Sequence, residues 1–406
     1  MRRSRLQMPV SSIAIIGAGI AGLSAATRLA AQGHAVTIFE KARGPGGRLA
    51  SRRTSEGPID IGAQYFTARD PRFQSALEQW RAAGVVATWG ERLLSLGKSA
   101  SDESQWQRLR DDSIRYVASP RISALSRHLS EQLPAHASLH SETRITRLIA
   151  DEGTASGKRW RLEDSDGDQH GPFDHVVISA PAPQARALLS TSGTDAQGVA
   201  LGEDSLAPAL SEALAQVEMA PTWTLMATLE TPLPALGGDA DWQGLLVSRG
   251  DDGPLRCVMR QHSRPGRQPP SHAKETQSKE TLSLLATAGW SRANLEKSPQ
   301  EVATLLWQAF EALPELRELA PGWSQGKVTL AAHRWRYAHP TQTLPQTSAA
   351  AGQKGYDQKD YVHNVCGQGS SGLWLAGDAL RGPRVEDAWL SGHEVAEQLL
   401  NTLADS

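Results

Sequence analysis

The stretch IAIIGAGIAGLSAATRLAAQGHAVTIFEKARGPGGR, residues 13–48, decides the fold. It opens with an apolar run that is typical of a buried parallel strand, and Gly17, Gly19 and Gly22 follow in GxGxxG spacing. A helix-like run comes next, and a second strand-like run ends at Glu40. In such a unit phosphates bind at the helix N-terminus and the carboxylate accepts the ribose hydroxyls, so the stretch predicts a dinucleotide site.

A second glycine loop, ARGPGGR, follows Glu40 and indicates which nucleotide is bound. An enzyme that binds only a nicotinamide dinucleotide does not need it, whereas the ribityl chain and flavin of FAD extend past the pyrophosphate. Gly46 and Gly47 allow the backbone to approach such a ligand closely, and Arg48 supplies a cation near phosphate and flavin. The loop therefore favours FAD over NAD.

The far end of the chain carries a matching pattern over residues 372–400. It reads as a strand, Gly377–Asp378, a loop, and a helix that starts at about Glu386. Asp378 is placed to accept a ribityl hydroxyl or to order a phosphate-bound water. The helix start presents N–H groups to the flavin edge, where negative charge develops on reduction. The two ends of the sequence are thus expected to form one discontinuous FAD-binding domain.

Composition limits the other possibilities. A chain of 406 residues is expected to form two domains, and 42 basic against 44 acidic residues give no support to a nucleic-acid partner. Cys257 and Cys366 form neither a CxxC nor a zinc spacing, as expected of free thiols in a reducing cytoplasm. Glycines interrupt the apolar stretch that follows the basic N-terminus, which argues against a signal peptide. No run approaches the roughly 20 apolar residues of a membrane span, so we expect a cytoplasmic protein without a membrane partner.

Motifs for other chemistries are missing from the sequence. It contains one dinucleotide fingerprint, no GxSxG elbow and no HExxH metal spacing. No cysteine lies near Gly377–Asp378, so the flavin is expected to be noncovalent. We expect no metal and no catalytic side chain, because the flavin carries the chemistry and the protein orients it.

The remaining patterns predict an α/β fold: an FAD/NAD(P)-binding Rossmann-like domain with a β-meander, plus a mixed-sheet α+β substrate domain. Helices are expected after Asp70 and over 121–133, and strands over 144–150, 159–164 and 175–181 are expected to form the meander. The expected FAD-binding domain comprises residues 11–69, 118–190 and 350–406, the substrate domain comprises 70–117 and 191–349, and surface insertions lie near 191–206, 262–280 and 345–360.

These motifs together resemble a known family. The order GxGxxG, ribose acid, GGR and C-terminal GD resembles the flavin amine-oxidase superfamily. GAQYFTARD (residues 62–70) and HRWRYA (333–338) more closely resemble bacterial renalase-like NAD/FAD-dependent oxidoreductases. The similarity extends from near position 10 to near position 400. It implies noncovalent FAD and an architecture like that of amine oxidases and p-hydroxybenzoate hydroxylase.

The resemblance also implies which residues bind the cofactor. The glycine loop would hold the pyrophosphate, Ala63 and Gln64 would lie along the flavin, and Ile145 would offer backbone to adenine. Arg43 is the basic residue after the ribose acid, one place later than in amine oxidases. The implied FAD-binding residues are Gly17, Gly19, Ala21, Gly22, Glu40, Arg43, Gly47, Arg48, Ala63, Gln64, Ile145, Gly377, Asp378, Glu386 and Ala388.

Aromatic residues in the shared segments predict a substrate pocket over the flavin. A flat nicotinamide-like ring would lie between the flavin and such side chains, and Arg334 would meet a substrate phosphate, although a solvated strand face explains this arginine equally well. Leu285 stands where renalase-like sequences often carry a histidine, so a polar pocket group has become apolar. The expected pocket residues are Tyr65, Trp223, Trp290, Arg334, Trp335 and Tyr337.

The expected activity follows from the resemblance. It is hydride transfer from a small dihydropyridine, such as a 2- or 6-dihydro isomer of NAD(P), to flavin N5, with O2 as acceptor and H2O2 as product. One alternative is a flavin amine or amino-acid oxidase. Another, from a different class, is a non-catalytic binder that keeps the architecture, as Rab GDP-dissociation inhibitors do.

Overall fold

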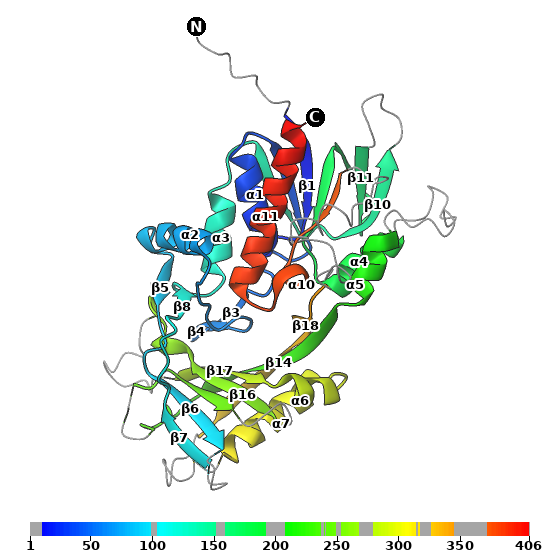
Figure 1. Ribbon diagram of the computed structural model, residues 1–406. Helices are drawn as coiled ribbons and strands as arrows, with labels where there is room; N and C mark the ends of the chain where they lie inside the picture. The colour runs from blue at the N-terminus through cyan, green and yellow to red at the C-terminus, as the bar shows by residue number, and fades with distance from the viewer. Residues whose placement is uncertain are drawn as a thin grey trace, which may run out of the picture. The chain divides into compact units, whose positions relative to one another are not determined.

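The structure is a computed structural model of the chain (Figure 1). Its contacts divide into two compact units, each assembled from discontinuous segments. The first unit comprises Met1–Gly47, Ser126–Met219 and Pro340–Ser406, and the second comprises Arg48–Leu125 and Ala220–His339. The residues that the structure describes are 10–98, 104–151, 159–191, 208–236, 239, 241–248, 253–267, 279–313, 316, 326–344 and 372–405.

A five-stranded parallel sheet forms the centre of the first unit, with strand order β19-β13-β1-β2-β9. Its strands are β1 (Ser12–Ile16), β2 (Ala35–Glu40), β9 (Ala137–Ser141), β13 (His175–Ile178) and β19 (Leu373–Leu375). Ile13, Ile15 and Ile38 are completely buried, and each such side chain contributes roughly 1.5–3 kcal/mol of burial free energy. The apolar runs of the sequence therefore become central parallel strands, as predicted.

Two helices that are far apart in the sequence lie side by side in this unit (Figure 1). They are α1 (Ile20–Ala30) and the C-terminal helix α11 (Val385–Ala404), which is drawn in red. Gly392 of α11 lies against the Ala21 carbonyl, where a Cβ atom would overlap the oxygen. A glycine is thus required for this close packing, which joins the two ends of the chain.

The β-meander of the first unit differs from the expected one. It consists of β10 (Ile145–Asp151), β11 (Arg159–Asp164) and β12 (Gln169–Phe173), all antiparallel. The sequence interpretation took the third strand to be 175–181, but this segment forms β13 of the parallel sheet. The interpretation was wrong because the polar residues between β11 and β13 have the composition of a turn. In the structure, Gln169–Phe173 of this segment form β12, which pairs with β11 at the edge of the meander. Helices α4 (Ala182–Thr191) and α5 (Pro208–Ala215) pack together beside the meander strand β10.

A seven-stranded mixed sheet forms the second unit, in the order β18-β14-β17-β16-β15-β6-β7. Its strands are β6 (Leu93–Lys98), β7 (Ser104–Arg108), β14 (Glu218–Leu229), β15 (Gly244–Ser248), β16 (Leu255–Arg260), β17 (Glu280–Ala286) and β18 (Val328–Gln342). The β15–β6 pair is parallel, whereas β14–β17, β16–β17 and β6–β7 are antiparallel. Buried leucines and Trp307 of α7 share one core cluster with this sheet.

Shorter elements complete the described chain. Asp70 caps helix α2 and accepts a hydrogen bond from the Arg72 N–H, with Pro71 at the first helical position, as the sequence predicted. The remaining elements are β3 (Ser51–Thr54), β4 (Gly57–Asp60), α2 (Pro71–Ala82), β5 (Val86–Thr88), β8 (Tyr116–Ala118), α3 (Ala124–Glu131), η1 (Gln261–Ser263), α6 (Ala288–Ala293), α7 (Pro299–Glu311) and α10 (Asp378–Arg381). Within the described residues, no helix is both long and apolar enough to cross a membrane.

The predicted fold class is confirmed: a Rossmann-like unit with a meander accompanies a mixed-sheet unit. The expected domain boundaries grouped residues 48–69 with the FAD segments, and these residues here belong to the second unit. Which unit binds which ligand remains a prediction. Most of the expected insertions near 191–206, 262–280 and 345–360 lie outside the described residues, as does Cys366.

Candidate functional site

The first glycine loop has the geometry that a bound pyrophosphate requires. Gly17 adopts φ 107°, and its N–H donates to the Phe39 carbonyl (2.8 Å). A Cβ at Gly22 would overlap the Gly17 carbonyl oxygen, so this glycine lets α1 pack directly on the loop. Gly19 is the N-cap of α1, no side chain caps this helix end, and a Cβ at Gly19 would meet nothing within 4 Å. The N-terminus of α1 thus fits an anion.

The second glycine loop packs on the first. The Gly46 N–H donates to the Ala18 carbonyl (2.9 Å), and a Cβ built on Gly47 would lie 3.4 Å from the Gly19 Cα. Gly47 also has φ 53°. The two glycine loops therefore present adjacent backbone, as expected for a ligand that continues past the pyrophosphate. Arg43, in the same segment, is exposed.

Glu40 ends β2 and is 5% exposed. Its Oε2 accepts a hydrogen bond from the Ala18 N–H (2.8 Å) and its Oε1 accepts one from the Ala42 N–H (2.8 Å). Each carboxylate oxygen accepts two hydrogen bonds, so capacity for ribose hydroxyls remains. The side chain thus has a second task that the sequence did not reveal: it ties the first glycine loop to the start of the second.

The C-terminal half of the pattern is buried. Asp378 is 4% exposed, and the Gly377 N–H donates to the Ser391 hydroxyl of α11 (2.9 Å). The residues after Gly377 form the short helix α10, where the sequence predicted a loop. Glu386 and Asp387 occupy the first turn of α11, so the chain's own carboxylates partly neutralise the positive helix end that was expected to face the flavin.

Ile145 and Ala388, the other predicted residues of this unit, are nearly buried at 8% and 7% exposure. Ile145 starts β10, and the Ala388 N–H donates to the carbonyl of Arg384, the N-cap residue of α11 (3.1 Å). The predicted residues of the first unit therefore lie on the parallel sheet and its glycine loops, on α1, at the start of α10, at the meander edge or on α11. We expect these residues to contact the nucleotide part of FAD.

In the second unit, Arg48, Ala63 and Gln64 lie on two loops that touch. The Ala63 N–H donates to the Arg48 carbonyl (3.0 Å), and a Cβ at Gly62 would overlap the same oxygen. Arg48 Nη1 donates to the Ala338 carbonyl of β18 (3.1 Å). The Gln64 side chain turns back into its own loop, where its Nε2 donates to the Asp60 and Gly62 carbonyls (3.0 Å each). The side-chain NH2 group of Gln64 is therefore occupied by the protein's own carbonyls.

A buried charge network beneath this loop was missed by the sequence interpretation. Asp60 is 0% exposed and accepts a hydrogen bond from Arg267 Nη2 (2.6 Å), while Arg264 Nε lies 3.3 Å from the same carboxylate. Asp60 also accepts from the Ser51 hydroxyl (2.6 Å). The sequence placed 262–280 in a surface insertion, which is wrong for Arg264 because it is 2% exposed. Its polar, proline-rich surroundings concealed this role.

Two of the aromatic residues that were predicted to line the substrate pocket, Trp223 and Trp335, have contacts that test this prediction. Trp223 is 0% exposed and its Nε1 donates to the Asn294 carbonyl (3.1 Å), so its ring lies inside the protein core and is not available to a ligand. Trp335 Nε1 donates to the Ile61 carbonyl (2.9 Å), which fixes this ring against the 60–65 segment. Tyr65, Trp290, Trp335 and Tyr337 are half-buried.

Arg334 is engaged by the protein itself. Its Nη1 donates to the Leu295 carbonyl (2.6 Å) and lies 3.4 Å from the Glu296 carboxylate. Arg336 forms two 2.8 Å hydrogen bonds to Glu296, which hold the pKa of that carboxyl below its usual range. The charged strand face alone accounts for these arginines, and a substrate phosphate would have to compete with Glu296.

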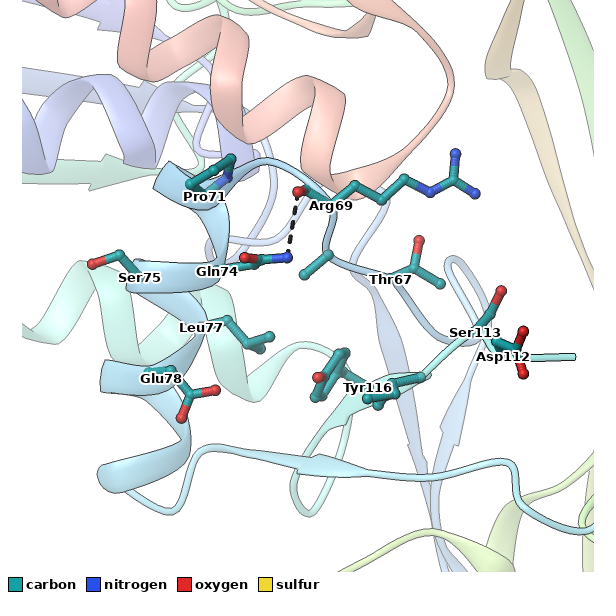
Figure 2. Close-up of a pocket in the computed structure, with 12 residues that line it drawn as sticks. Thr67, Arg69, Pro71, Gln74, Ser75, Leu77, Glu78, Asp112, Ser113 and Tyr116 are labelled. Atoms are coloured by element: carbon teal, nitrogen blue, oxygen red, sulfur yellow. Dashed lines mark hydrogen bonds between the residues drawn. The ribbon is translucent and has the colours of Figure 1, made fainter.

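A separate cleft of about 640 Å³ lies along α2 in the second unit (Figure 2). Its lining includes the apolar side chains of Leu77 and Tyr116, and the Gln74 amide donates to the Arg69 carbonyl (3.3 Å). None of the predicted site residues lines it. The cleft therefore does not define the candidate site.

Comparison with known proteins identifies the family. The model of the flavin containing amine oxidoreductases matches residues 110–400, and that of the NAD(P)-binding Rossmann-like domain matches residues 15–80. The chain belongs to the flavin-containing amine oxidoreductase family. This is a family of flavin-containing oxidoreductases, so FAD is the cofactor that the family implies.

Individual relatives are similar over different extents. A 4,4'-diapophytoene desaturase of Staphylococcus haemolyticus is 52% identical over 58 residues, which are 14% of this chain and 12% of the relative. The chain thus matches about an eighth of that relative's length. A putative protoporphyrinogen oxidase from Exiguobacterium superposes with a TM-score of 0.65 at 16% identity, over 98% of this chain and 100% of the other. Putrescine oxidase bound to putrescine gives a TM-score of 0.62 at 12% identity, over 97% and 99%. At these identities the structures support the fold alone.

Proposed function

We propose that this flavin-containing oxidoreductase is renalase-like and oxidises a small dihydropyridine, such as a 2- or 6-dihydro isomer of NAD(P). The observation that supports it is a set of hydrogen bonds among the segments that carry the resemblance. Arg48 of GGR donates to the Ala338 carbonyl, and Trp335 of HRWRYA donates to the Ile61 carbonyl beside GAQYF. The segments that resemble this family thus act as one structural assembly in the second unit.

Under this proposal the donor ring is held by aromatic side chains. Tyr65, Trp335 and Tyr337 are the walls we retain, because each is partly exposed and lies on or beside that assembly. Bound FAD would supply the acceptor for a hydride, and O2 would take two electrons and two protons, one from the hydride and one from solvent, to give H2O2. No side-chain base is needed, because a dihydropyridine that loses a hydride becomes aromatic. The first-unit residues around Glu40 and the glycine loops would hold the nucleotide part of FAD.

Leu285 is the position at which this sequence differs from renalase-like sequences, and the proposal must account for it. It lies on β17, is 7% exposed, and packs in one buried cluster with Cys257 and Met259, against which the Tyr65 side chain also packs. The position where renalase-like sequences often have a histidine is therefore next to a proposed pocket wall. An apolar group there favours a donor that is recognised by stacking more than by hydrogen bonds.

The deciding experiment is anaerobic mixing of the yellow holoenzyme with candidate donors while flavin absorbance is followed. We expect fast bleaching by 2- or 6-dihydro-NAD(P) and slow bleaching by ordinary NAD(P)H. Leu285→His tests the departure, with Leu285→Met as a volume-conserving control. The proposal fails if amines bleach the flavin and the dihydro isomers do not.

An amine oxidase is the second candidate, and family membership favours it. An amine donor would also deliver a hydride, in this case from the carbon of a C–N bond. The same mixing experiment with a panel of primary amines and diamines distinguishes the two candidates. Only dihydropyridines are expected to reduce the flavin of a renalase-like enzyme, and only amines that of an amine oxidase.

A further inference from the structure

The 60–64 segment is held by hydrogen bonds to nearly every carbonyl. The Asp60 carbonyl accepts from the Ser283 hydroxyl (2.6 Å), and the Ile61 carbonyl accepts from Thr224 Oγ1 (2.8 Å) as well as from Trp335. The Gly62 carbonyl accepts from the Gln64 amide. A loop that is fixed in this way cannot adjust to a ligand, so its shape is determined before binding.

Arg264 holds the end of this segment. Its Nη1 donates to the Gln64 backbone carbonyl (2.7 Å) and its Nη2 donates to Gln64 Oε1 (2.8 Å). Its guanidinium also lies over the Trp89 ring, 4.8 Å from the centroid, and Trp89 neighbours Tyr65 with ring centroids 6.4 Å apart. The planar guanidinium of arginine has two parallel N–H donors that fit this geometry, whereas a lysine ammonium cannot make the same pair of bonds.

The charges around Arg264 do not balance. Arg264 and Arg267 are two cations with side chains that are 1% and 5% exposed, and Asp60 is the one carboxylate that both contact among the described residues. Burial lowers the pKa of Arg264 to about 10, so it stays protonated at neutral pH. Burial also raises the pKa of the neighbouring Cys257 thiol, which keeps it neutral. Nearby, Arg260 and Glu280 compensate each other at 2.5 Å. Counting only the described residues, one buried positive charge is left over.

We propose that Arg264 is a positioning residue that fixes the Gln64 backbone and, together with Arg267, keeps an uncompensated positive charge behind the 60–65 loop, so that the reduction potential of the bound FAD is raised. The inference rests on the proposed function, in which Ala63 and Gln64 lie along the flavin. Reduction adds negative charge to the flavin, and a buried cation favours the charged form more strongly than an exposed one does.

The test is the reduction potential of bound FAD, measured anaerobically against a reference dye. Arg264→Gln removes the charge, and Arg264→Lys keeps the charge but loses the paired bonds to Gln64. Arg256→Gln is the matched control, because Arg256 is an exposed arginine on the neighbouring strand β16. We expect Arg264→Gln to weaken binding of reduced relative to oxidised FAD by about tenfold, a fall of about 30 mV for a two-electron couple. Arg256→Gln is expected to leave the potential unchanged.

Arg264→Lys separates charge from position. We expect Arg264→Lys to keep most of the parent's reduction potential. Both Arg264→Gln and Arg264→Lys are expected to shift the absorbance band of the bound flavin, because each loses the paired bonds to Gln64. If Arg264→Gln does not fold, Arg267→Gln removes a charge from the same cluster and must lower the potential in the same direction. An unchanged potential in an FAD-loaded variant that lacks either charge overturns the inference.

The outcome is independent of the substrate. A lowered potential together with no reduction by dihydro-NAD(P) isomers would refute the proposed substrate and leave the inference standing. Reduction by those isomers together with an unchanged potential in the variants would support the proposed substrate and refute the inference.

Discussion

The glycine loops of the first unit and the 60–65 loop of the second are both rigid backbone surfaces, but they are fixed by different means. The glycine loops are held by the absence of side chains: Gly22 fits where a Cβ would overlap the Gly17 carbonyl. The 60–65 loop is held by side chains from β14, β17, β18 and the segment after β16. A local motif can specify the first kind of surface, whereas the second needs residues up to about 270 positions apart.

The largest expected effect comes from the glycine loops. Gly22→Ala places a Cβ on the Gly17 carbonyl oxygen and must displace α1, so we expect loss of bound FAD and a lower melting temperature. Gly19→Ala meets nothing within 4 Å, so we expect an unchanged fold and weakened FAD binding. Flavin content and melting temperature of the purified variants measure the two effects.

Gly97→Ala serves as control for the glycine series, because its Cβ also meets nothing within 4 Å but lies on β6 of the second unit. It is expected to retain FAD. Full FAD retention by Gly19→Ala would show that the N-terminus of α1 does not bind the pyrophosphate.

The Asp60 network provides the next largest effect. Asp60→Asn leaves Arg264 and Arg267 buried without a counter-charge, which is expected to cost about 3–5 kcal/mol of stability. The shift of the denaturant midpoint measures this. Asp241→Asn is a suitable control, because its pair with Arg92 is exposed and is expected to contribute about 0–1 kcal/mol. Equal midpoints for the two variants would contradict the importance of the buried network.

The same contrast explains what the sequence could predict. The strand, glycine loop, helix and acid that ends at Glu40 are contiguous, so their spacing alone predicts their geometry. Asp60, Arg264 and Arg267 come together only because β4 and the segment after β16 meet in the fold, and no spacing rule connects them. Trp223 shows the reverse error: a shared motif suggested a pocket wall, but burial in the core decides its role.

Glu40 tests whether the acid has one task or two. Glu40→Ala removes a ribose acceptor and leaves the Ala18 and Ala42 N–H groups without it, so we expect FAD binding to weaken by about 1–3 kcal/mol. Hydride transfer in the variant reconstituted with FAD is expected to be nearly unchanged. Glu40→Gln keeps one acceptor oxygen, so its affinity for FAD should lie between those of Glu40→Ala and the parent. Retention of FAD during dialysis is the measurement, and equal retention by Glu40→Ala and the parent would exclude the ribose role.

The smallest expected effect is a pH dependence of stability. Burial lowers the pKa of His34 and His175 in the first unit and of His262 and His333 in the second. In the unfolded chain these groups titrate near 6.5, so below that pH the unfolded state binds more protons and stability falls, whereas above it their contribution is constant. We expect the melting temperature to be level above about pH 7 and to fall between about pH 6.5 and 5, before most carboxylates titrate.

His34 allows this effect to be assigned to one side chain. It is 2% exposed, its Nδ1 accepts a hydrogen bond from the Ser11 N–H (3.3 Å), and its Nε2 has no hydrogen-bond partner among the described residues. Protonation would place a second N–H against the Ser11 donor, so the ring must stay neutral. His34→Asn can keep an acceptor for Ser11 but cannot titrate. Its melting temperature should therefore fall less steeply below pH 6.5 than that of the parent, and an equally steep fall would show that the other buried histidines account for the whole dependence.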